Sequence, residues 1–229
     1  MNNLFSLENP LMRFLARVFD MIVSNALFLI CCVPVVTAGA AIAALNKVTQ
    51  GIVLDRDFGT IRLFFRAFRE NFKQATAAFL VLLLIFLSLA CNALLVMIYL
   101  TGTLAVVLKG VLFVLAVLVL AVAVYLFPLM TRYDNALREH VKNAMILAVA
   151  KLPRTVVMVL VTSLPVLVPY FSLPTFFQTL PFFFIIGFSF MSYVSSQLLV
   201  PVFRELEGDQ EAPSEEQEAP SEEQEAEDE

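Results

Sequence analysis

The segment that decides the fold class reads TVVMVLVTSLPVLVPYFSLPTFFQTLPFFFIIGFSFMSYVSSQLLVPVF, residues 155–203, with no Lys, Arg, Asp or Glu in 49 positions. A helix needs roughly 20 apolar residues to cross the hydrocarbon core of a bilayer, so this segment is long enough for two. Four prolines lie near its middle: Pro165, Pro169, Pro174 and Pro181. Because proline interrupts helices, they predict a hairpin turn near residues 172–179. We expect membrane helices at about 155–171 and 180–203.

Uncharged runs elsewhere in the sequence predict three further membrane helices, at about 19–45, 75–100 and 110–130. The composition agrees, since 60% of the residues are hydrophobic, only 15% are charged and the mean hydropathy is +0.85. A soluble domain of this size needs a more polar surface. The sequence therefore predicts an all-α, polytopic transmembrane helical bundle over residues 1–204.

Charge is distributed very unevenly between this body and the C-terminal segment. All 15 Lys and Arg and seven acidic residues lie in residues 1–204, a net charge of +8, whereas 13 acidic residues lie in 205–229. The segment QEAPSEE repeats in tandem at residues 210–216 and 217–223. Such a sequence has nothing with which to bury a core, so we expect 205–229 to be a disordered acidic tail.

The basic residues also predict the topology. Six lie in the loop after the first span: Lys47, Arg56, Arg62, Arg66, Arg69 and Lys73. The loop after the third span carries five more: Arg132, Arg138, Lys142, Lys151 and Arg154. The positive-inside rule places both loops and the C-terminal tail in the cytoplasm. Five crossings then put the N-terminus outside, against the evidence of Arg13 and Arg17. In the alternative, the first segment breaks at Pro34 to Gly39 and re-enters, leaving four crossings.

Residues 59–73 predict an amphipathic helix at the cytoplasmic interface. Its apolar residues recur at helical spacing: Ile61, Phe64, Phe65, Phe68 and Phe72. A separate basic stripe follows steps of four, three and four: Arg62, Arg66, Arg69 and Lys73. Such a helix would anchor the bundle, with Phe at the acyl boundary and Arg near anionic headgroups of membrane lipids. Alternatively, the surface including Phe64 and Phe68 docks a partner protein or the acidic tail.

The segment CVPVVTAG, residues 32–39, interrupts the first predicted span. Pro34 removes a helical hydrogen bond, and the Thr37 hydroxyl can bind a carbonyl that this frees. We interpret the segment as a kink, with Gly39 and the alanines after it allowing close packing of helices. The alternative is a broken helix whose backbone lines a substrate site, as in many transporters.

Signals of catalysis or of metal and cofactor binding are weak. The cysteines Cys31, Cys32 and Cys91 lie in apolar runs with no metal-site spacing, and we expect neither a metal nor a cofactor. His140 is the single histidine, in a charged loop. No ionisable residue lies deep in a predicted span, although coupled transporters usually need one. We expect no catalytic residues, no enzymatic activity and no nucleic-acid partner.

Several motifs together resemble the YesL family, small bacterial membrane proteins grouped as a domain of unknown function. They begin with Asn25 and residues 32–39 and continue through FFRAFRENFKQA at residues 64–75. Further matching segments are FPL at 127–129, RYD at 132–134, KNA at 142–144 and LP at 152–153. The acidic repeats depart from the family pattern.

The resemblance implies a protein of the bacterial cytoplasmic membrane that takes part in carbohydrate uptake. We therefore expect an accessory or regulatory component that contacts an ABC-type sugar permease. A second copy of the chain, in a homo-oligomer, is a further candidate partner. The alternative is a self-sufficient transporter or channel for small solutes.

Overall fold

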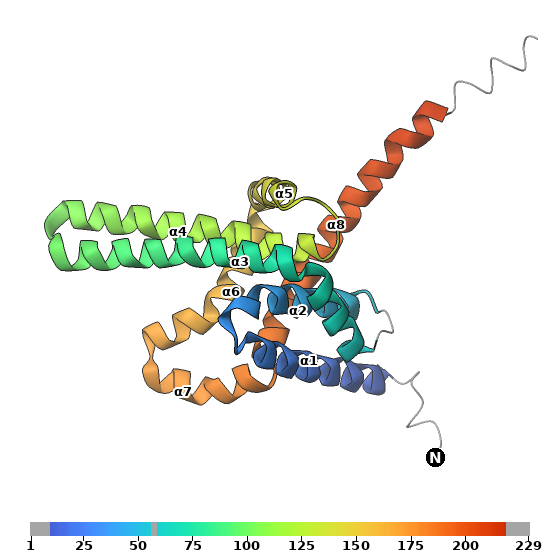
Figure 1. Ribbon diagram of the computed structural model, residues 1–229, viewed down its shortest axis with the longest axis horizontal. Coiled ribbons are helices and arrows are strands. Elements are labelled where there is room, and N and C mark those ends of the chain that lie inside the picture. The colour runs from blue at the N-terminus through green and yellow to red at the C-terminus, as the bar shows by residue number, and fades with distance from the viewer. Residues whose placement is uncertain (1–9, 56–58, 219–229) are drawn as a thin grey trace, which may run out of the picture.

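The computed structural model describes residues 10–55 and 59–218, and its regular elements are all helical (Figure 1). The first four helices are α1 (Pro10–Cys32), α2 (Ala38–Val53), α3 (Thr60–Tyr99) and α4 (Gly102–Met130). The others are α5 (Leu137–Ala150), α6 (Leu152–Phe171), α7 (Leu173–Phe182) and α8 (Phe188–Glu218). The predicted all-α class is confirmed.

Five helical segments are long and apolar enough to cross a membrane. They are Leu11–Cys32, Thr60–Tyr99, Gly102–Met130, Leu152–Pro169 and Pro174–Gly208. The number five agrees with the prediction, and three predicted spans fall within α3, α4 and α6. The fold is therefore that of a multi-pass membrane protein.

The first predicted span, 19–45, is not one helix. Helix α1 ends at Cys32, a 3-10 turn covers Val35–Thr37, and α2 begins at Ala38. The chain reverses direction there. The evidence is an ion pair of 3.0 Å that joins Arg17, in the first half of α1, to Asp55, just beyond α2. The kink interpretation is wrong: after Pro34, which lacks an N–H, the chain turns back against α1.

This reversal also corrects the predicted topology. Thr60, at the start of α3, donates a hydrogen bond of 2.5 Å to the Asp20 carboxylate in α1. The start of α1 therefore lies at the same end of the molecule as the loop between α2 and α3. This geometry agrees with the alternative in which the first segment turns back at Pro34 to Gly39 and not with an N-terminus on the opposite side from the first basic loop, so the conflict posed by Arg13 and Arg17 disappears.

Helix α2 occupies the centre of the packed region, between α3 and α8 (Figure 1). Its buried residues are mostly small or polar: Gly39, Ala40, Ala41, Ala43, Ala44, Leu45, Asn46, Val48, Thr49, Gln50 and Gly51. A Cβ on Gly39 would lie 2.3 Å from the Ala75 carbonyl oxygen and 2.5 Å from the Phe79 Cβ. Glycine at position 39 is what lets α2 and α3 approach this closely, as the small residues predicted.

Helix α3 is a single helix of 40 residues. The predicted amphipathic helix at 59–73 is its first part, not a separate element, and it packs along α2 through Leu63, Phe64 and Ala67. The distal part of α3 and α4 project together from the packed region as a hairpin (Figure 1). Thus α3 belongs to two very different environments.

The turn predicted at 172–179 is shorter in the structure. Only Ser172 separates α6 from α7, and its hydroxyl accepts a hydrogen bond of 3.4 Å from the Thr175 N–H, which caps α7. Residues 173–179 are helical because proline is tolerated in a first helical turn, where its missing N–H costs nothing. A π-helical segment, Phe183–Gly187, then joins α7 to α8.

The predicted start of the disordered tail, residue 205, lies inside α8, which continues to Glu218. A disordered segment from 205 is therefore not what the structure shows for residues 205–218. Glu, Gln and Ala in this segment are good helix formers, whereas Gly208 and Pro213 are poor ones, so the extension depends on the helix already nucleated by packing. Residues 219–229 of the predicted tail lie outside the described part of the chain.

Candidate functional site

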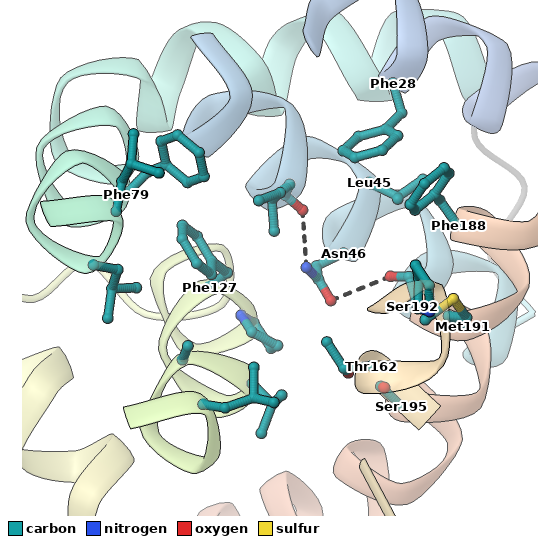
Figure 2. Close-up of a pocket in the computed structure, with 18 of the residues that line it drawn as sticks. Phe28, Leu45, Asn46, Phe79, Phe127, Thr162, Phe188, Met191, Ser192 and Ser195 are labelled. Atoms are coloured by element: carbon teal, nitrogen blue, oxygen red, sulfur yellow. Dashed lines mark hydrogen bonds between the residues drawn. The ribbon is translucent and has the colours of Figure 1, made fainter. Parts of the chain in front are cut away.

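A cavity of about 370 Å³ lies beside α2, walled by α3, α4, α6 and α8 and closed at one edge by Phe28 of α1 (Figure 2). Its lining includes four polar residues: Asn46, Thr162, Ser192 and Ser195. All its other lining residues are apolar, and none is charged. The volume falls within the range of small-molecule sites, but the wall offers very few hydrogen-bonding groups.

The polar side chains near the cavity fasten α2 to α8. The Asn46 amide donates to the Ile42 carbonyl oxygen at 2.8 Å, and its Oδ1 accepts from the Ser192 hydroxyl at 3.2 Å (Figure 2). The Thr49 hydroxyl lies 2.8 Å from that of Ser192 and 3.0 Å from that of Ser196. Buried polar groups in a membrane protein need such partners, so these contacts fix how α2 and α8 are aligned.

The C-terminal half of α2 is also attached to the end of α4. Lys47 donates a hydrogen bond to the Thr131 carbonyl oxygen, at the C-cap of α4. The Gln50 amide lies 3.4 Å from the Pro128 carbonyl oxygen and 3.4 Å from the Thr131 hydroxyl. A cation at a helix C-terminus is favourable because free carbonyl groups concentrate negative charge there. Lys47, predicted in a loop, is thus part of the helix packing.

Asn25 in α1 binds the π-helical segment between α7 and α8. Its amide nitrogen donates to the carbonyl oxygens of Phe183, at 3.2 Å, and Phe184, at 2.8 Å. Its Oδ1 accepts from the Ser189 N–H at 3.0 Å, and the Ser189 hydroxyl lies 2.7 Å from that of Ser24. A π-helical turn disturbs the regular backbone hydrogen bonds, and one fully buried asparagine supplies the replacements.

Ion pairs attach α8 to the loop before α5 and to the junction of α5 and α6. Arg132 makes two hydrogen bonds of 2.8 Å to the Glu207 carboxylate, and its guanidinium lies 5.0 Å from the centre of the Phe203 ring. Glu205 pairs with Lys151 at 2.5 Å and with Arg154 at 3.6 Å. These first two carboxylates of the predicted tail are therefore bound to the body.

His140 is buried on α5, with 1% of its surface exposed. Neither ring nitrogen has a hydrogen-bond partner of normal geometry among the described residues. Burial lowers the pKa of His140, opposed by the Asn135 backbone and by the carboxylates of Glu139 and Asp134. The ring is not presented to the cavity or to solvent.

The predicted docking residues on α3 divide into two groups. Arg62, Arg66, Arg69 and Lys73 are all exposed. Phe64, in contrast, is fully buried against α2, and Phe68 is half-buried with its ring stacked on Phe64 at 6.5 Å between centroids. Phe64 is therefore not available to a partner or to lipid. The apolar face of this segment meets the alanines of α2 instead.

The residues of the predicted helix break lie away from the cavity. Pro34 is exposed beside Val33, of which 81% is exposed. The Thr37 hydroxyl lies 2.6 Å from the Cys31 carbonyl oxygen and 2.8 Å from that of Pro34, so it does bind carbonyls freed at the break. The Pro34, Thr37 and Gly39 segment shapes the chain reversal and does not line the cavity.

Sequence reasoning missed Asn46, Thr49 and Gln50, the residues that connect α2 to α8 and α4. In the sequence these three residues fall at the end of the first predicted span and in the loop after it, and so apart from the serines of α8 that they contact. Their spacing of three and four residues, which places all three on one side of a helix, was the available signal.

This architecture defines a class: a polytopic helical membrane protein built around a short, buried, small-residue helix. No group of three potential metal ligands occurs within residues 10–55 and 59–218. A family described as "Protein of unknown function, DUF624" matches residues 21–93, from α1 through α2 into the distal part of α3. Over this segment the chain is similar to that YesL-like family, which confirms the resemblance. No curated protein and no solved structure matches the chain.

Proposed function

We propose that this protein is an accessory subunit in carbohydrate uptake, acting by lateral contact with another membrane protein. The observation that carries the proposal is the form of α3. One helix holds an exposed basic stripe at its start and an exposed apolar surface along its distal part. Because the start is packed on α2, the two surfaces are held at a set orientation to each other, as docking requires.

The basic stripe of α3 consists of Arg62, Arg66, Arg69 and Lys73. None of these four cations forms an ion pair with a residue in the described part of the chain. Other basic residues, such as Arg132 and Lys151, are paired internally. The stripe is therefore available to acidic groups of a partner or to anionic lipid headgroups.

The assignment to carbohydrate uptake, with an ABC-type sugar permease as partner, rests on the resemblance to the YesL family. We place the protein in the bacterial cytoplasmic membrane with its basic loops inside, by the positive-inside rule. A reporter fused after Glu229 should then be cytoplasmic, and so should one fused before Met1. Reporters on opposite sides would contradict the reversal between α1 and α2.

Charge reversal along the stripe tests the docking. The protein is purified from its native membrane in mild detergent, and a stoichiometric sugar-permease subunit is expected with it. The variant carrying R62E, R66E, R69E and K73E should lose that subunit. The control carries R138E and K142E, two exposed cations on α5, and should keep it. Equal association in both variants would remove the stripe from the proposal.

A self-sufficient transporter is the second candidate, and the cavity beside α2 is the observation in its favour. Against sugar transport, the lining has four polar residues and no charge, whereas a sugar presents many hydroxyl groups that need partners once desolvated. Sugar flux into liposomes that contain the purified protein alone would establish this candidate. Absence of flux alone, with flux restored by the permease, would favour the accessory role.

We further propose that the protein catalyses no reaction. His140, the single histidine of the sequence, is buried away from the cavity, and this burial lowers its pKa. The polar groups that do reach the cavity are an amide and three hydroxyls with no base beside them. Chemical conversion of a sugar by the purified protein, lost in His140→Gln without loss of stability, would contradict this.

A further inference from the structure

We propose that the cavity beside α2 binds the hydrocarbon chain of an uncharged amphiphile, whose polar end lies at Ser195. A long-chain alcohol or monoacylglycerol has this chemistry. The inference is independent of the proposed function, because it concerns what occupies the cavity and not what binds the basic stripe of α3.

The shape and lining of the cavity fit a single chain. Along α4 the lining extends from Leu120 to Pro128, eight residues or about 12 Å at the rise of an α-helix. Leu120 and Phe86 are apolar, as are all but four of the lining residues. Leu83 also lines the cavity and is 39% exposed, so the cavity reaches the outer surface of a membrane-spanning helix, where lipid chains lie.

The polar end of the cavity has an unused hydroxyl group. Ser195 is 7% exposed and lines the cavity; its hydroxyl forms none of the hydrogen bonds found among the described residues, although it is not one of the fully buried atoms without a partner. Thr162 adds a second hydroxyl from α6 (Figure 2). Because the Ser195 side chain lines the cavity, a hydroxyl or ester group of a ligand there would find a hydrogen-bonding partner.

The polarity of the cavity is oriented as a membrane amphiphile would be. Asn46 lies next to Lys47, which binds the end of α4, so the polar side lies nearest to the basic loops. Phe86 and Leu120 lie deeper in the spans. A head near the basic loops with its chain toward Phe86 matches the arrangement of lipid in one leaflet. The lack of any charged lining residue selects an uncharged head.

Fluorescence quenching tests the site, because the sequence contains no tryptophan. Phe86→Trp places the single reporter at the apolar end, and Leu95→Trp, at a half-exposed position outside the cavity, serves as the control. The full chain is placed in phosphatidylcholine vesicles and titrated with a monoacylglycerol that carries a dibrominated chain. Quenching of Phe86→Trp should saturate at a roughly tenfold lower mole fraction of probe than quenching of Leu95→Trp.

Two further variants define the site. Ala123→Phe fills the cavity and should abolish the saturable quenching of Phe86→Trp. Ser195→Ala removes one hydroxyl without changing the fold and should weaken binding roughly fivefold, the factor expected for one neutral hydrogen bond.

The same brominated chain with a phosphate head should bind at least tenfold more weakly. Parallel, unsaturated quenching of both reporters would overturn the site. Equal binding of the phosphate-headed probe, or an unaffected Ser195→Ala, would overturn the assignment of the polar end.

Discussion

In soluble proteins large apolar side chains are buried and polar ones are exposed. Helix α2 and the distal part of the α3–α4 hairpin show the opposite pattern. In α2 the buried residues are mainly Ala, Gly, Asn, Thr and Gln. In the distal hairpin the residues are mainly Leu, Val, Ile and Phe, and many are exposed, including Leu84, Met97, Val106 and Phe113. Between Phe79 and Leu95, α3 has no buried residue.

The comparison shows what determines burial in a membrane. Lipid tails solvate Leu and Val as well as a protein core does, so apolar side chains gain little by leaving them. Small residues gain van der Waals contact through close backbone approach, and polar residues gain hydrogen bonds that lipid cannot provide. In this protein, small size and polarity identify the centre better than hydrophobicity does.

The largest expected effect comes from glycine replaced by alanine in the two regions. Gly39→Ala places a Cβ 2.3 Å from the Ala75 carbonyl oxygen, a backbone atom that cannot move alone. We expect a loss of about 3 kcal/mol or more in the free energy of unfolding, at the upper end for overpacking. Gly110→Ala, where a Cβ meets nothing within 4 Å, should change it by less than about 1 kcal/mol. Thermal unfolding in detergent measures both, and equal melting temperatures would contradict the close contact of α2 and α3.

Truncation of methionine gives the second comparison. Met158 is fully buried in the packed region, and Met97 on the hairpin is 70% exposed. Met158→Ala leaves a cavity and should cost about 2 kcal/mol, at the low end for core truncation because lipid reduces the transfer contribution. Met97→Ala should cost less than about 0.5 kcal/mol. Unfolding monitored by circular dichroism in mixed micelles separates the two. A large loss from Met97→Ala would show that the hairpin face is covered.

The third comparison replaces an asparagine with leucine in each region. Asn25 makes three hydrogen bonds to the π-helical segment and Ser189, whereas Asn92 on the hairpin is exposed and donates only to the Ser88 carbonyl oxygen at 2.8 Å. Asn25→Leu should cost about 2 kcal/mol, because buried backbone groups are left without partners. Asn92→Leu should be neutral or slightly stabilising in detergent. Limited proteolysis near residues 183–187 is a second readout that only Asn25→Leu should accelerate.

The smallest expected effect is a pH dependence of the free energy of unfolding. The packed region contributes this dependence and the hairpin does not. Because the folded pKa of His140 is lowered, the unfolded chain binds the proton more readily. Stability should therefore decrease as the pH falls below about 6.5, the usual pKa of histidine. In His140→Leu the dependence between pH 7.5 and 5.5 should be lost, since no other histidine is present. Melting temperatures across this range provide the measurement, and an unchanged slope in the variant would assign the effect elsewhere.

Much of the architecture could be predicted because long uncharged runs leave few alternatives. Five segments of sufficient length were expected and five are present. The boundary at 171 was correct because Ser172 and the neighbouring prolines act locally. Less could be predicted for α2, since 16 residues of moderate polarity resemble the end of a longer span.

The candidate site was harder to predict for a related reason. The stripe of Arg62, Arg66, Arg69 and Lys73 was expected on an outer face and is exposed, because helical spacing alone separates it from the apolar face. The apolar face of the same helix segment can pack against either lipid or another helix, and the sequence does not distinguish the two. Phe64 is buried only because the alanines of α2 lie beside it, and nothing near Phe64 in the sequence specifies those alanines.

By itself, the sequence determined that this is an all-helical membrane protein with basic loops at one end and an acidic C-terminal segment. Those properties follow from run length and charge, which are local. Only the tertiary structure decided that the first segment reverses at Pro34, that α2 is the centre and that a cavity lies beside it. These depend on contacts between residues far apart in the chain, such as Gly39 with Ala75 and Asn46 with Ser192, where steric fit and hydrogen bonding select one arrangement.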